Sequence, residues 1–567
     1  MSDYGIYKYP LYETRPIKDL RDMLRGSCEI YADKAAFYEK HDGEYKAIKY
    51  KQYLEDVNAL GTKLMDMGLK GERIAVIGEA SYNWAVSYMA VVCGVGVIVP
   101  LDKELPKEEI INLINVSGVK MIIYSPKVKT IDDDIKVQYK VPMGPELDAL
   151  MEEGRVLLEN GDRAYLDTEI DVDAMSILLF TSGTTGMAKG VMHSHRTICA
   201  NLKAMPTMFV VHPDDIFLSV LPIHHTYECT CGFLCMIYMG ASIAYCEGLR
   251  HIVKNLKESK ATVMLGVPLL FESIYKNIYK NIDKQGKRKA VEKAIKISNA
   301  AKKVGIDLTR VLFKEIHNGL GGHLRFFISG AAAIDPAVAK GFRDFGINLI
   351  QGYGLTECAP IAALNRDKYF KDDAAGLPLP GVEIKTVDVN TEGIGEILIK
   401  GGNVMLGYYE NPQLTAEAIT DGWYHSGDLG YIDEDGFVHI TGRKKDVIVT
   451  KNGKNIFPEE LESYLSRSEF IDDSLVMGKE RGGDTIIAAQ IVPNYSEVEA
   501  KLGKDYTQEQ LVELIKDEIT KVNNMVQGYK HILSFSIRLR PFAKTTTHKI
   551  QRFKEENISE EGNIQGK

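Results

Sequence analysis

One loop of the sequence combines hydroxyl groups, glycines and a cation in a pattern suited to phosphate binding. An apolar run from Ile177 leads into Thr181, Ser182, Gly183, Thr184 and Thr185, and Lys189 follows. Small residues allow several backbone N–H groups to approach one anion, and the hydroxyl groups and the ammonium supply further donors. The spacing differs from a Walker A loop, G-x-x-x-x-G-K-[S/T], because only two residues separate Gly183 from Gly186 and a glycine follows Lys189. The pattern predicts a phosphate-binding loop and disfavours a kinase-type enzyme.

A second stretch, residues 351–357, could contact an aromatic ring of a ligand and a metal ion. Gly352 and Gly354 flank Tyr353, which lets its flat ring lie against another ring. Glu357 is the one acidic residue of this stretch. A carboxylate beside a phosphate loop repels the phosphates unless a hard cation bridges them, so Mg²⁺ is implied.

Two further glycine-punctuated stretches contribute charged groups. Asp428, which follows Ser426 and Gly427, is an acidic residue of the type that hydrogen-bonds a ribose diol. The guanidinium group of Arg443 can donate two parallel hydrogen bonds to phosphate or carboxylate oxygens. Taken singly, these stretches are equally well explained as a turn and a surface charge run. Together with the phosphate loop they predict a nucleotide site.

The elements that must position these residues follow an α/β pattern. Short apolar runs typical of strands, such as residues 73–79 and 348–354, alternate with helical patterns. Residues 52–68 carry apolar side chains at three- and four-residue steps and end in glycine, which predicts an amphipathic helix. Strands that alternate with helices indicate mostly parallel sheets. We therefore expect a large α/β body with two mostly parallel sheets up to about residue 380.

The remainder of the chain changes character twice. Residues 380–443 are rich in alternating strands, with a turn predicted at residues 433–436. From about residue 446, helical patterns such as residues 507–523 accompany short strands, which predicts a small α+β domain extending to residue 567. At 567 residues the chain is too long for one core, in agreement with several domains.

Composition limits the partners and the compartment. A net charge of −9 provides no basic footprint for nucleic acid. The N-terminal residues do not read as a signal peptide, and 18 apolar residues never follow one another. Eight scattered cysteines fit a reducing compartment, and Cys229, Cys231 and Cys235 are expected to be core residues and not metal ligands. We expect a cytoplasmic protein.

A lysine-rich segment, residues 275–303, could touch an anionic membrane surface. Its acidic residues and its Ile and Ala spacing favour a solvated surface helix instead. We therefore expect at most peripheral membrane contact.

The motifs and their order resemble the adenylate-forming superfamily of acyl-CoA synthetases, nonribosomal adenylation domains and luciferases, whose hallmark loop is similar to T-S-G-T-T-G-x-x-K-G. The resemblance extends from about residue 20 to residue 552. Residues 221–228, 267–278, 320–336 and 349–360 are more similar to the long-chain fatty acyl-CoA synthetases than to other branches. This branch implies a medium- to long-chain fatty acid, ATP, Mg²⁺ and CoA.

The resemblance also implies roles for individual residues. The residues implied to bind the phosphates are Thr181, Ser182, Gly183, Thr184, Thr185 and Lys189. Glu357 is implied to bind Mg²⁺, with help from Thr181. The residues implied to line the adenine are Gly330, Gln351, Gly352 and Tyr353. Thr356 is implied to bind the α-phosphate, Asp428 to bind the ribose, and Arg443 to bind the ribose or a phosphate. His225 is implied at the acyl entrance, Gly453 at the pantetheine tunnel and Lys549 as the lysine that acts during adenylation. The catalytic set is thus Lys549, Glu357, Lys189 and Arg443.

In this family a small C-terminal domain swings about a hinge. The resemblance implies an adenylation domain over residues 1–443, a hinge at 444–445 that includes Lys445, and a C-terminal lid over residues 446–567. The last motif departs from the family pattern, since Ala543 replaces a proline and His548 a glycine beside Lys549.

Alternatives to a fatty acyl-CoA synthetase stay open. An acyl-AMP ligase that loads an acyl carrier protein is one, although no large insertion follows the hinge, which favours CoA. An aryl-CoA or other carboxylate–CoA ligase is another. Lys189, Glu357, Asp428 and Lys549 argue against a non-catalytic nucleotide- or lipid-binding protein. The chain length of the acid and the choice between monomer and homodimer are not determined by the sequence.

Overall fold

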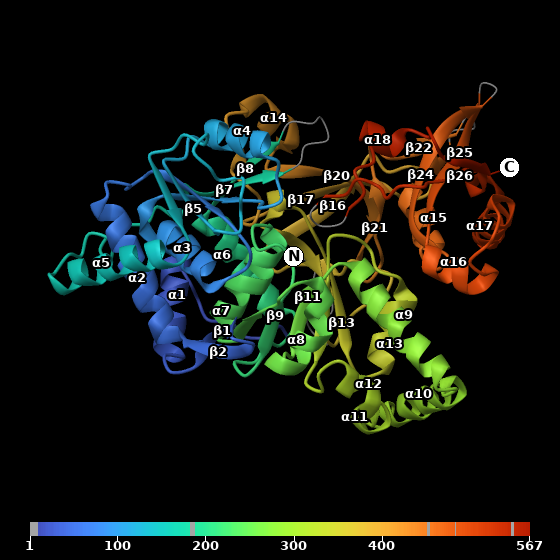
Figure 1. Cartoon of the computed structure of the whole chain (residues 1–567), viewed down its shortest axis with the longest axis horizontal. Coiled ribbons are helices and arrows are strands. Elements are labelled where there is room, and N and C mark those ends of the chain that lie inside the picture. Colours follow the sequence, from blue (N-terminus) through green and yellow to red (C-terminus); the bar gives the residue numbers. More distant parts are fainter. Residues whose placement is uncertain (1–8, 182–187, 451–453, 482–483, 546–548, 567) are drawn as a thin grey trace. The chain divides into compact units, whose positions relative to one another are not determined.

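The computed structural model describes residues 9–181, 188–450, 454–481, 484–545 and 549–566 (Figure 1). The chain forms two compact units. The first comprises Met1–Lys385, Leu398–His425 and Asp433–Val438, and the second comprises Thr386–Ile397, Ser426–Ile432 and His439–Lys567.

A seven-stranded sheet in the first unit carries the predicted phosphate loop. Its strands, in order, are β18 (Gly407–Tyr408), β8 (Lys189–Ser194), β7 (Met175–Thr181), β4 (Val97–Leu101), β3 (Arg73–Ile77), β5 (Met121–Tyr124) and β6 (Tyr139–Pro142). The strands from β7 to β6 are parallel, whereas β8 and β18 are antiparallel to their neighbours. Apolar side chains of α4 (Lys107–Ser117), among them Ile110 and Leu113, pack on β3, β4 and β5.

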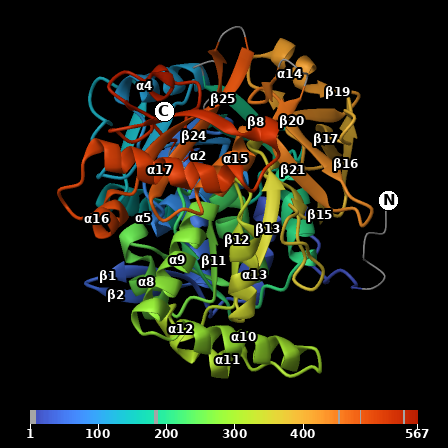
Figure 2. The same ribbon diagram turned by 90° about the vertical axis from the view of Figure 1, so that its right-hand side faces the viewer.

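A nine-stranded sheet forms the second layer of the first unit. Its strands, in order, are β15 (Leu377–Pro378), β14 (Ile361–Leu364), β13 (Asn348–Gly354), β12 (Phe326–Ser329), β11 (Val263–Gly266), β9 (Ile216–Ser219), β10 (Ser242–Tyr245), β1 (Ala35–His41) and β2 (Glu44–Lys49). The strands from β13 to β1 are parallel. Helices α8 (Ile252–Ser259), α9 (Pro268–Lys284) and α13 (Pro336–Asp344) cover one face, where Phe271 and Phe342 pack on Phe327 (Figure 2).

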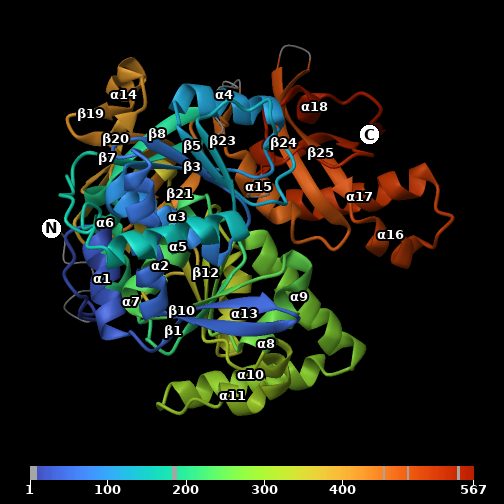
Figure 3. The same cartoon turned by 60° about the vertical axis from the view of Figure 1, so that its left-hand side comes forward.

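Other helices of the first unit pack on one another. Helices α2 and α5 lie side by side (Figure 3), and they approach closely at Gly154, where a Cβ atom would lie 1.9 Å from the Ala59 carbonyl oxygen. These and the remaining helices are α1 (Leu20–Ile30), α2 (Tyr50–Asp66), α3 (Tyr82–Ala90), α5 (Pro145–Glu159), α6 (His195–Ala204), α7 (Cys235–Met239), α10 (Arg288–Lys302), α11 (Thr309–Leu312), α12 (Lys314–Gly319) and α14 (Pro412–Ala418). Two π-helices, η1 (Val91–Val95) and η3 (Tyr227–Leu234), interrupt the α-helical pattern.

Smaller sheets follow in the sequence. One has the order β16 (Val382–Val387), β17 (Gly395–Gly401), β20 (Trp423–Ile432) and β19 (Ile419–Thr420), with β21 (Val438–Arg443) on β20. In the second unit, β22 (Ile448–Val449) pairs with β23 (Asn455–Ile456). A four-stranded sheet has the order β24 (Ile471–Arg481), β25 (Asp484–Pro493), β26 (Ile532–Ile537) and β27 (Ile564–Gly566).

The core of the second unit lies between this four-stranded sheet and two helices. Leu461 of α15 (Pro458–Leu465) and Leu511, Ile515 and Ile519 of α17 (Gln508–Asn523) pack on sheet residues that include Ile487 and Phe535. A capping box of Thr507 and Gln510 begins α17. The other helices of this unit are α16 (Tyr495–Leu502) and α18 (Glu555–Ile558).

The predicted fold class is confirmed. The helix expected at residues 52–68 is α2, displaced by two residues, and the turn at residues 433–436 closes with a hydrogen bond from the Gly436 N–H to the Asp433 carbonyl oxygen, 2.9 Å. The lysine-rich segment is not one helix but two, α9 and α10, separated at Gly286, whose φ of 66° suits a residue without a side chain. In the part of the chain that the structure describes, no helix combines the length and the apolar character needed to cross a bilayer.

Candidate active site

The ends of the predicted phosphate loop are held together by strand pairing. Thr181, the last residue of β7, lies opposite Lys189, the first residue of β8, in the antiparallel register. Ser182, Gly183, Thr184 and Thr185 come between these ends in the sequence and lie outside the described residues. The Lys189 side chain is thereby fixed at the point where the loop returns to the sheet.

Lys189 and Glu357 are joined through one tyrosine. The Lys189 ammonium lies 5.4 Å from the centroid of the Tyr408 ring, and the Tyr408 hydroxyl donates a 2.9 Å hydrogen bond to Glu357 Oε1. Tyr408 reaches this place because β18 pairs with β8, with Tyr408 opposite Val191. Burial, and then the charge of Glu357, hold the pKa of the Tyr408 hydroxyl well above its usual value, so that it stays protonated and a donor.

A second tyrosine lies beside this pair. Tyr424 is buried on β20, and burial together with the charges of Glu357 and Tyr408 raises its pKa well above the ordinary value. Two protonated tyrosine hydroxyl groups therefore lie close enough to Glu357 to feel its charge, and Tyr408 donates to it. Sequence inspection assigned no role to either tyrosine, although Tyr424 lies in the stretch 423–430 that contains Asp428.

The short helix that carries Glu357, η5 (Thr356–Cys358), is held by a buried histidine. His193 Nε2 lies 2.7 Å from the Thr356 carbonyl oxygen, and its Nδ1 lies 3.0 Å from Thr197 Oγ1. Because a carbonyl oxygen only accepts, Nε2 carries the proton. Burial lowers the pKa of His193 to about 4, so the ring is neutral near pH 7. Sequence inspection missed His193, which follows the phosphate loop as part of β8.

Two buried asparagines fix the chain that follows Glu357. The Asn201 side chain accepts from the Ile361 N–H at 2.8 Å and donates to the Ile361 carbonyl oxygen at 3.1 Å. Asn403 donates to the carbonyl oxygens of Cys358 at 3.1 Å and Ile361 at 3.0 Å. The Met405 N–H donates to the Glu357 carbonyl oxygen at 2.8 Å. Three separate segments thus determine where the Glu357 backbone lies.

The predicted adenine-binding residues gather at adjacent carboxyl ends of β12 and β13. Ser329, which precedes Gly330, lies opposite Gln351 in the parallel register, so Gly330, Gln351, Gly352 and Tyr353 come from neighbouring positions. A Cβ atom at Gly330 would lie 2.9 Å from the Tyr227 ring, which explains the glycine. The Gln351 amide donates to the Asp372 carbonyl oxygen at 2.6 Å and so also supports a neighbouring loop.

His225 lies in the turn that precedes η3. Its ring centroid is 4.9 Å from that of His224, and His224 Nε2 is 3.6 Å from Asp102 Oδ2. Further along this segment Cys229, Cys231 and Cys235 are buried, and burial raises the pKa of each thiol. The described residues contain no group of three His, Cys, Asp or Glu side chains that could hold a metal ion.

In the second unit, the predicted ribose ligand and the predicted arginine form an ion pair. Arg443 Nε lies 2.7 Å from Asp428 Oδ1, at the adjacent strands β21 and β20. Desolvation lowers the pKa of the Lys549 ammonium, the charge of Arg443 lowers it further, and Asp428 opposes this change. The structure therefore brings Asp428, Arg443 and Lys549 within electrostatic reach of one another.

The loop that carries Lys549 is closed by a buried asparagine that sequence inspection missed. The Thr545 N–H donates to the Lys549 carbonyl oxygen at 2.8 Å. Asn557 accepts from the Ala543 N–H at 2.8 Å and donates to the carbonyl oxygens of Ala543 at 2.8 Å and Gln551 at 2.9 Å. Both ends of the loop are thus fixed, and His548 lies outside the described residues.

The predicted hinge residue has an aromatic neighbour. The Lys445 ammonium lies 5.0 Å from the centroid of the Phe553 ring. The next residue, Asp446, lies 3.7 Å from Arg552 Nε, and Arg552 also pairs with Glu462 of α15. Gly453 lies outside the described residues.

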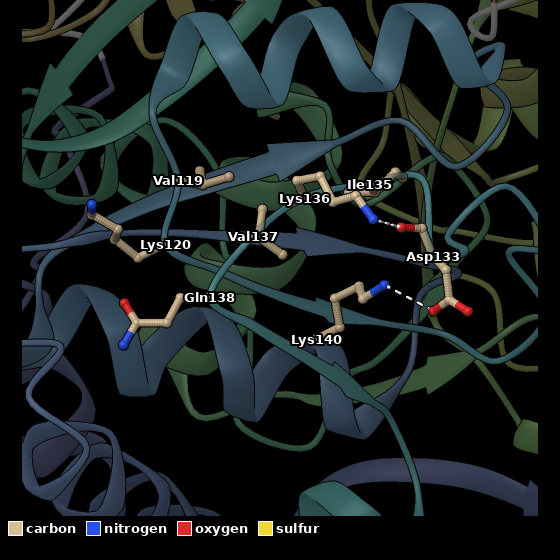
Figure 4. Close-up of a pocket in the computed structure, with 8 residues that line it drawn as sticks. All are labelled: Val119, Lys120, Asp133, Ile135, Lys136, Val137, Gln138 and Lys140. Carbon is tan, nitrogen blue, oxygen red and sulfur yellow. Dashed lines mark hydrogen bonds and ion pairs between the residues drawn. The ribbon is translucent and has the colours of Figure 1, made fainter.

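An open surface pocket lies apart from these residues (Figure 4). Its lining comes from residues 119–140 near β6, at one edge of the seven-stranded sheet, whereas β8 and β18 lie toward the other edge. Two of its three lysines contact Asp133, since Lys136 donates to the Asp133 carbonyl oxygen at 2.6 Å and Lys140 lies 3.5 Å from Asp133 Oδ1. No predicted site residue lines it.

Two family models match the chain. Residues 24–409 match the model of AMP-binding enzymes, and residues 445–558 match that of the AMP-binding enzyme C-terminal domain. The chain belongs to the AMP-binding enzyme family. It is an adenylate-forming carboxylate ligase of the AMP-forming acid–thiol type.

Individual relatives are similar to most of the chain. Human long-chain-fatty-acid–CoA ligase 1 is 30% identical over 80% of this chain and 70% of its own length. The chloroplastic long-chain-fatty-acid–[acyl-carrier-protein] ligase AEE15 of Arabidopsis thaliana is 26% identical over 89% of this chain and 80% of its own. The crystal structure of the anthranilate CoA ligase AuaEII with anthranoyl-AMP superimposes with a TM-score of 0.76 at 20% identity, covering 96% of this chain and 97% of that one.

The neutral state of His193 predicts a pH dependence of stability. Its pKa is about 4 in the folded protein, below the ordinary value of 6.5, so unfolding binds a proton in this interval. Stability is therefore fully present above pH 6.5 and falls as the pH falls toward 4, by about 1.4 kcal/mol per pH unit for this residue. His193→Gln should show a smaller pH slope of the unfolding free energy in denaturant titrations at pH 4.5 to 7. Substitution of the exposed His251 by Gln is the control, and equal slopes in both variants would contradict the assignment.

Proposed function

We propose that the protein is an AMP-forming fatty acyl-CoA synthetase. It activates a medium- to long-chain fatty acid with ATP and Mg²⁺ to acyl-AMP and pyrophosphate, and then transfers the acyl group to CoA. The observation that carries the proposal is the linked set of Lys189, Tyr408 and Glu357, which joins a cation at the phosphate loop to a carboxylate. The fatty acid is supported by relatives named for long-chain fatty acids.

Glu357 is suited to bind Mg²⁺. The Tyr408 hydroxyl donates to one oxygen of its carboxylate, Oε1, while the Glu357 side chain remains partly exposed. Carboxylate oxygen is the ligand type that Mg²⁺ prefers, and the ion usually keeps several waters and binds substrate phosphates. The bound ion would neutralise charge on the ATP phosphates. Thr181, at the end of β7, would add a hydroxyl oxygen from the loop.

In the first half-reaction an oxygen of the fatty acid carboxylate attacks the α-phosphorus, and the bond from that phosphorus to the bridging oxygen of pyrophosphate breaks. No proton has to move, so positioning and charge neutralisation are the catalytic needs. Lys189 would anchor the departing phosphates. Lys549 would stabilise the charge on the α-phosphate, and Thr356 would bind the same group.

In the second half-reaction the thiolate sulfur of CoA attacks the acyl carbonyl carbon, and the bond from that carbon to the AMP oxygen breaks. The thiol proton is released to solvent and AMP leaves. Asp428 and Arg443 would bind the ribose and its phosphate, with their ion pair opening to do so. Lys445 would act as hinge, His225 would lie at the acyl entrance, and Gly453 in the passage for pantetheine.

An acyl carrier protein is the second candidate acceptor, because the relative AEE15 is named for that acceptor. The two acceptors share the same first half-reaction. They differ in whether free CoA suffices for release of AMP.

The substrate and the acceptor can be tested together. Purified protein is incubated with ATP, Mg²⁺ and acids from acetate to stearate, with benzoate and anthranilate as aromatic comparisons. We expect AMP release with the medium and long aliphatic acids, dependent on CoA, with a fatty acyl thioester as product. Activity with aromatic acids alone would exclude the fatty acid. AMP release that requires acyl carrier protein and not CoA would establish the second candidate.

Lys549 should act in one half-reaction only. In Lys549→Ala we expect fatty acid-dependent ATP–pyrophosphate exchange to fall by about 100-fold or more, as for loss of a preorganised charge at a transition state. Thioester formation from supplied acyl-AMP and CoA should stay within about threefold, since that step needs no stabilisation of the α-phosphorus. Lys554→Ala, at an exposed lysine paired with Glu556, is the control. Equal losses in both half-reactions would contradict the role.

Tyr408 should influence the requirement for magnesium. Tyr408→Phe removes the donor to Glu357 Oε1 and retains the ring beside Lys189, so the carboxylate loses its orientation. We expect the Mg²⁺ concentration for half-maximal activity to rise by about 10-fold. Tyr409→Phe, whose ring lies under Arg73, is the matched control. An unchanged Mg²⁺ requirement in Tyr408→Phe would show that the hydrogen bond does not orient a metal ligand.

A further inference from the structure

Four large apolar side chains are exposed where α10 turns into α11. Val304 is 74% exposed, Ile306 53%, Val311 75% and Leu312 39%. We call these four residues the apolar tip. Single exposed apolar residues are common on proteins, but four within nine residues of chain are a local concentration.

The apolar tip is a folded feature. The Ile306 N–H donates to the Ala301 carbonyl oxygen at 3.0 Å, and the Leu312 N–H donates to the Leu308 carbonyl oxygen at 2.9 Å. Arg310 donates to the carbonyl oxygens of Gly322 at 2.9 Å and Leu324 at 2.6 Å, which ties α11 to the chain that leads into β12. Figures 1, 2 and 3 agree in placing α10 and α11 together at an outer edge of the first unit. The apolar side chains therefore have defined positions.

The outward side of α10 is basic. Ser298 is buried and marks the inner side of the helix, and Lys289, Lys293 and Lys296 lie on the opposite side at helical spacing, together with the exposed Glu292. These three lysines and the neighbouring Lys303 are exposed and form no ion pair with any residue that the structure describes. We call the four lysines the basic flank.

Charge is concentrated here against the trend of the molecule. Residues 283–315 contain ten Lys or Arg and four acidic residues, in a chain whose net charge is −9. Asp283 pairs with Arg288 and Glu315 pairs with Lys287, whereas Asp307 accepts from the Thr309 N–H at 2.9 Å and from its hydroxyl at 2.6 Å. These three acids are therefore engaged with groups other than the four lysines of the flank.

We propose that the apolar tip and the basic flank bind the surface of an anionic phospholipid bilayer. Exposed aliphatic side chains enter the boundary between headgroups and acyl chains, and lysines beside them contact lipid phosphates while their stems lie along apolar surface. Each lysine near an anionic surface adds to the binding, and the attraction is screened by salt. The lysines of the basic flank match the anionic headgroups of this boundary, and the exposed Val and Ile side chains match its acyl chains.

This proposal extends beyond the catalysed reaction. Long fatty acids partition into bilayers, so an enzyme docked at the surface would meet its substrate where the substrate is concentrated. The docking surface itself rests on exposure and charge, and it would remain if the acid were of another class. Vesicle binding and AMP release test the two ideas separately.

Vesicle flotation measures the interaction directly. The full chain is mixed with vesicles of palmitoyl-oleoyl phosphatidylglycerol and phosphatidylcholine in equal parts, or of phosphatidylcholine alone, in 50 mM salt. We expect flotation with the anionic vesicles only. The triple variant Lys289→Gln, Lys293→Gln, Lys296→Gln should bind about 100-fold more weakly, and Val304→Ser, Ile306→Ser, Val311→Ser about 10-fold more weakly.

Matched controls separate this surface from general adsorption. Lys46→Gln, Lys70→Gln, Lys120→Gln changes three exposed lysines of the same unit, and Ile30→Ser, Val116→Ser, Val156→Ser changes three comparably exposed apolar residues. Both should float like the unchanged protein, and all variants should retain activity toward a water-soluble acid. Absence of binding to anionic vesicles, or equal loss in the control variants, would overturn the proposal. Loss with the lysine changes but none with the tip changes would also overturn it, because it would show adsorption without insertion.

Discussion

Under the proposed function, the hydrogen bond from Tyr408 to Glu357 would answer the main electrostatic difficulty at Lys189 and Glu357. A carboxylate placed near a loop that binds anions raises the energy of the bound anion, unless the carboxylate is held in one orientation for a cation. Tyr408 supplies that orientation through its hydroxyl and contacts Lys189 through its ring. Its own position depends on the pairing of β18 with β8, so the same strand that carries Lys189 also carries the partner of Glu357.

The backbone around Glu357 is held by hydrogen bonds from several separate segments of the chain. His193 binds the residue before it, Asn403 binds the residue after it, and Met405 binds Glu357 itself. The Asn403 amide nitrogen makes two of these hydrogen bonds, whereas its buried side-chain oxygen has no partner among the described residues. Buried hydrogen bonds of this kind favour a single arrangement of the groups that they join. The neutral imidazole of His193 belongs to this network because a charged ring at the same place would be desolvated without a counter-ion.

The second half-site is organised by a loop closure. Asn557 connects Ala543 with Gln551, so the chain returns on itself and presents Lys549 near Arg443 and Asp428. The replacement at Ala543 leaves this closure intact, since Asn557 contacts the backbone of residue 543 and not its side chain. An asparagine that recognises backbone atoms tolerates side-chain change at its partners.

Periodicity and composition were sufficient to predict the α/β class, the two mostly parallel sheets and the small C-terminal α+β fold, because strand and helix patterns are local properties of the chain. They also predicted a helix at residues 52–68, which the structure has at residues 50–66. Motif order was sufficient to indicate the family. The sequence did not reveal Tyr408, His193 or Asn201, because each acts through a partner far away in the chain, and it did not reveal Asn557, because this residue contacts backbone atoms and belongs to no motif with a recognisable spacing. Only the tertiary structure decided these contacts, and only burial shows that His193 is neutral. It likewise separated the exposed apolar residues around Val304 from ordinary core positions, since exposure depends on what packs against a side chain and not on its type.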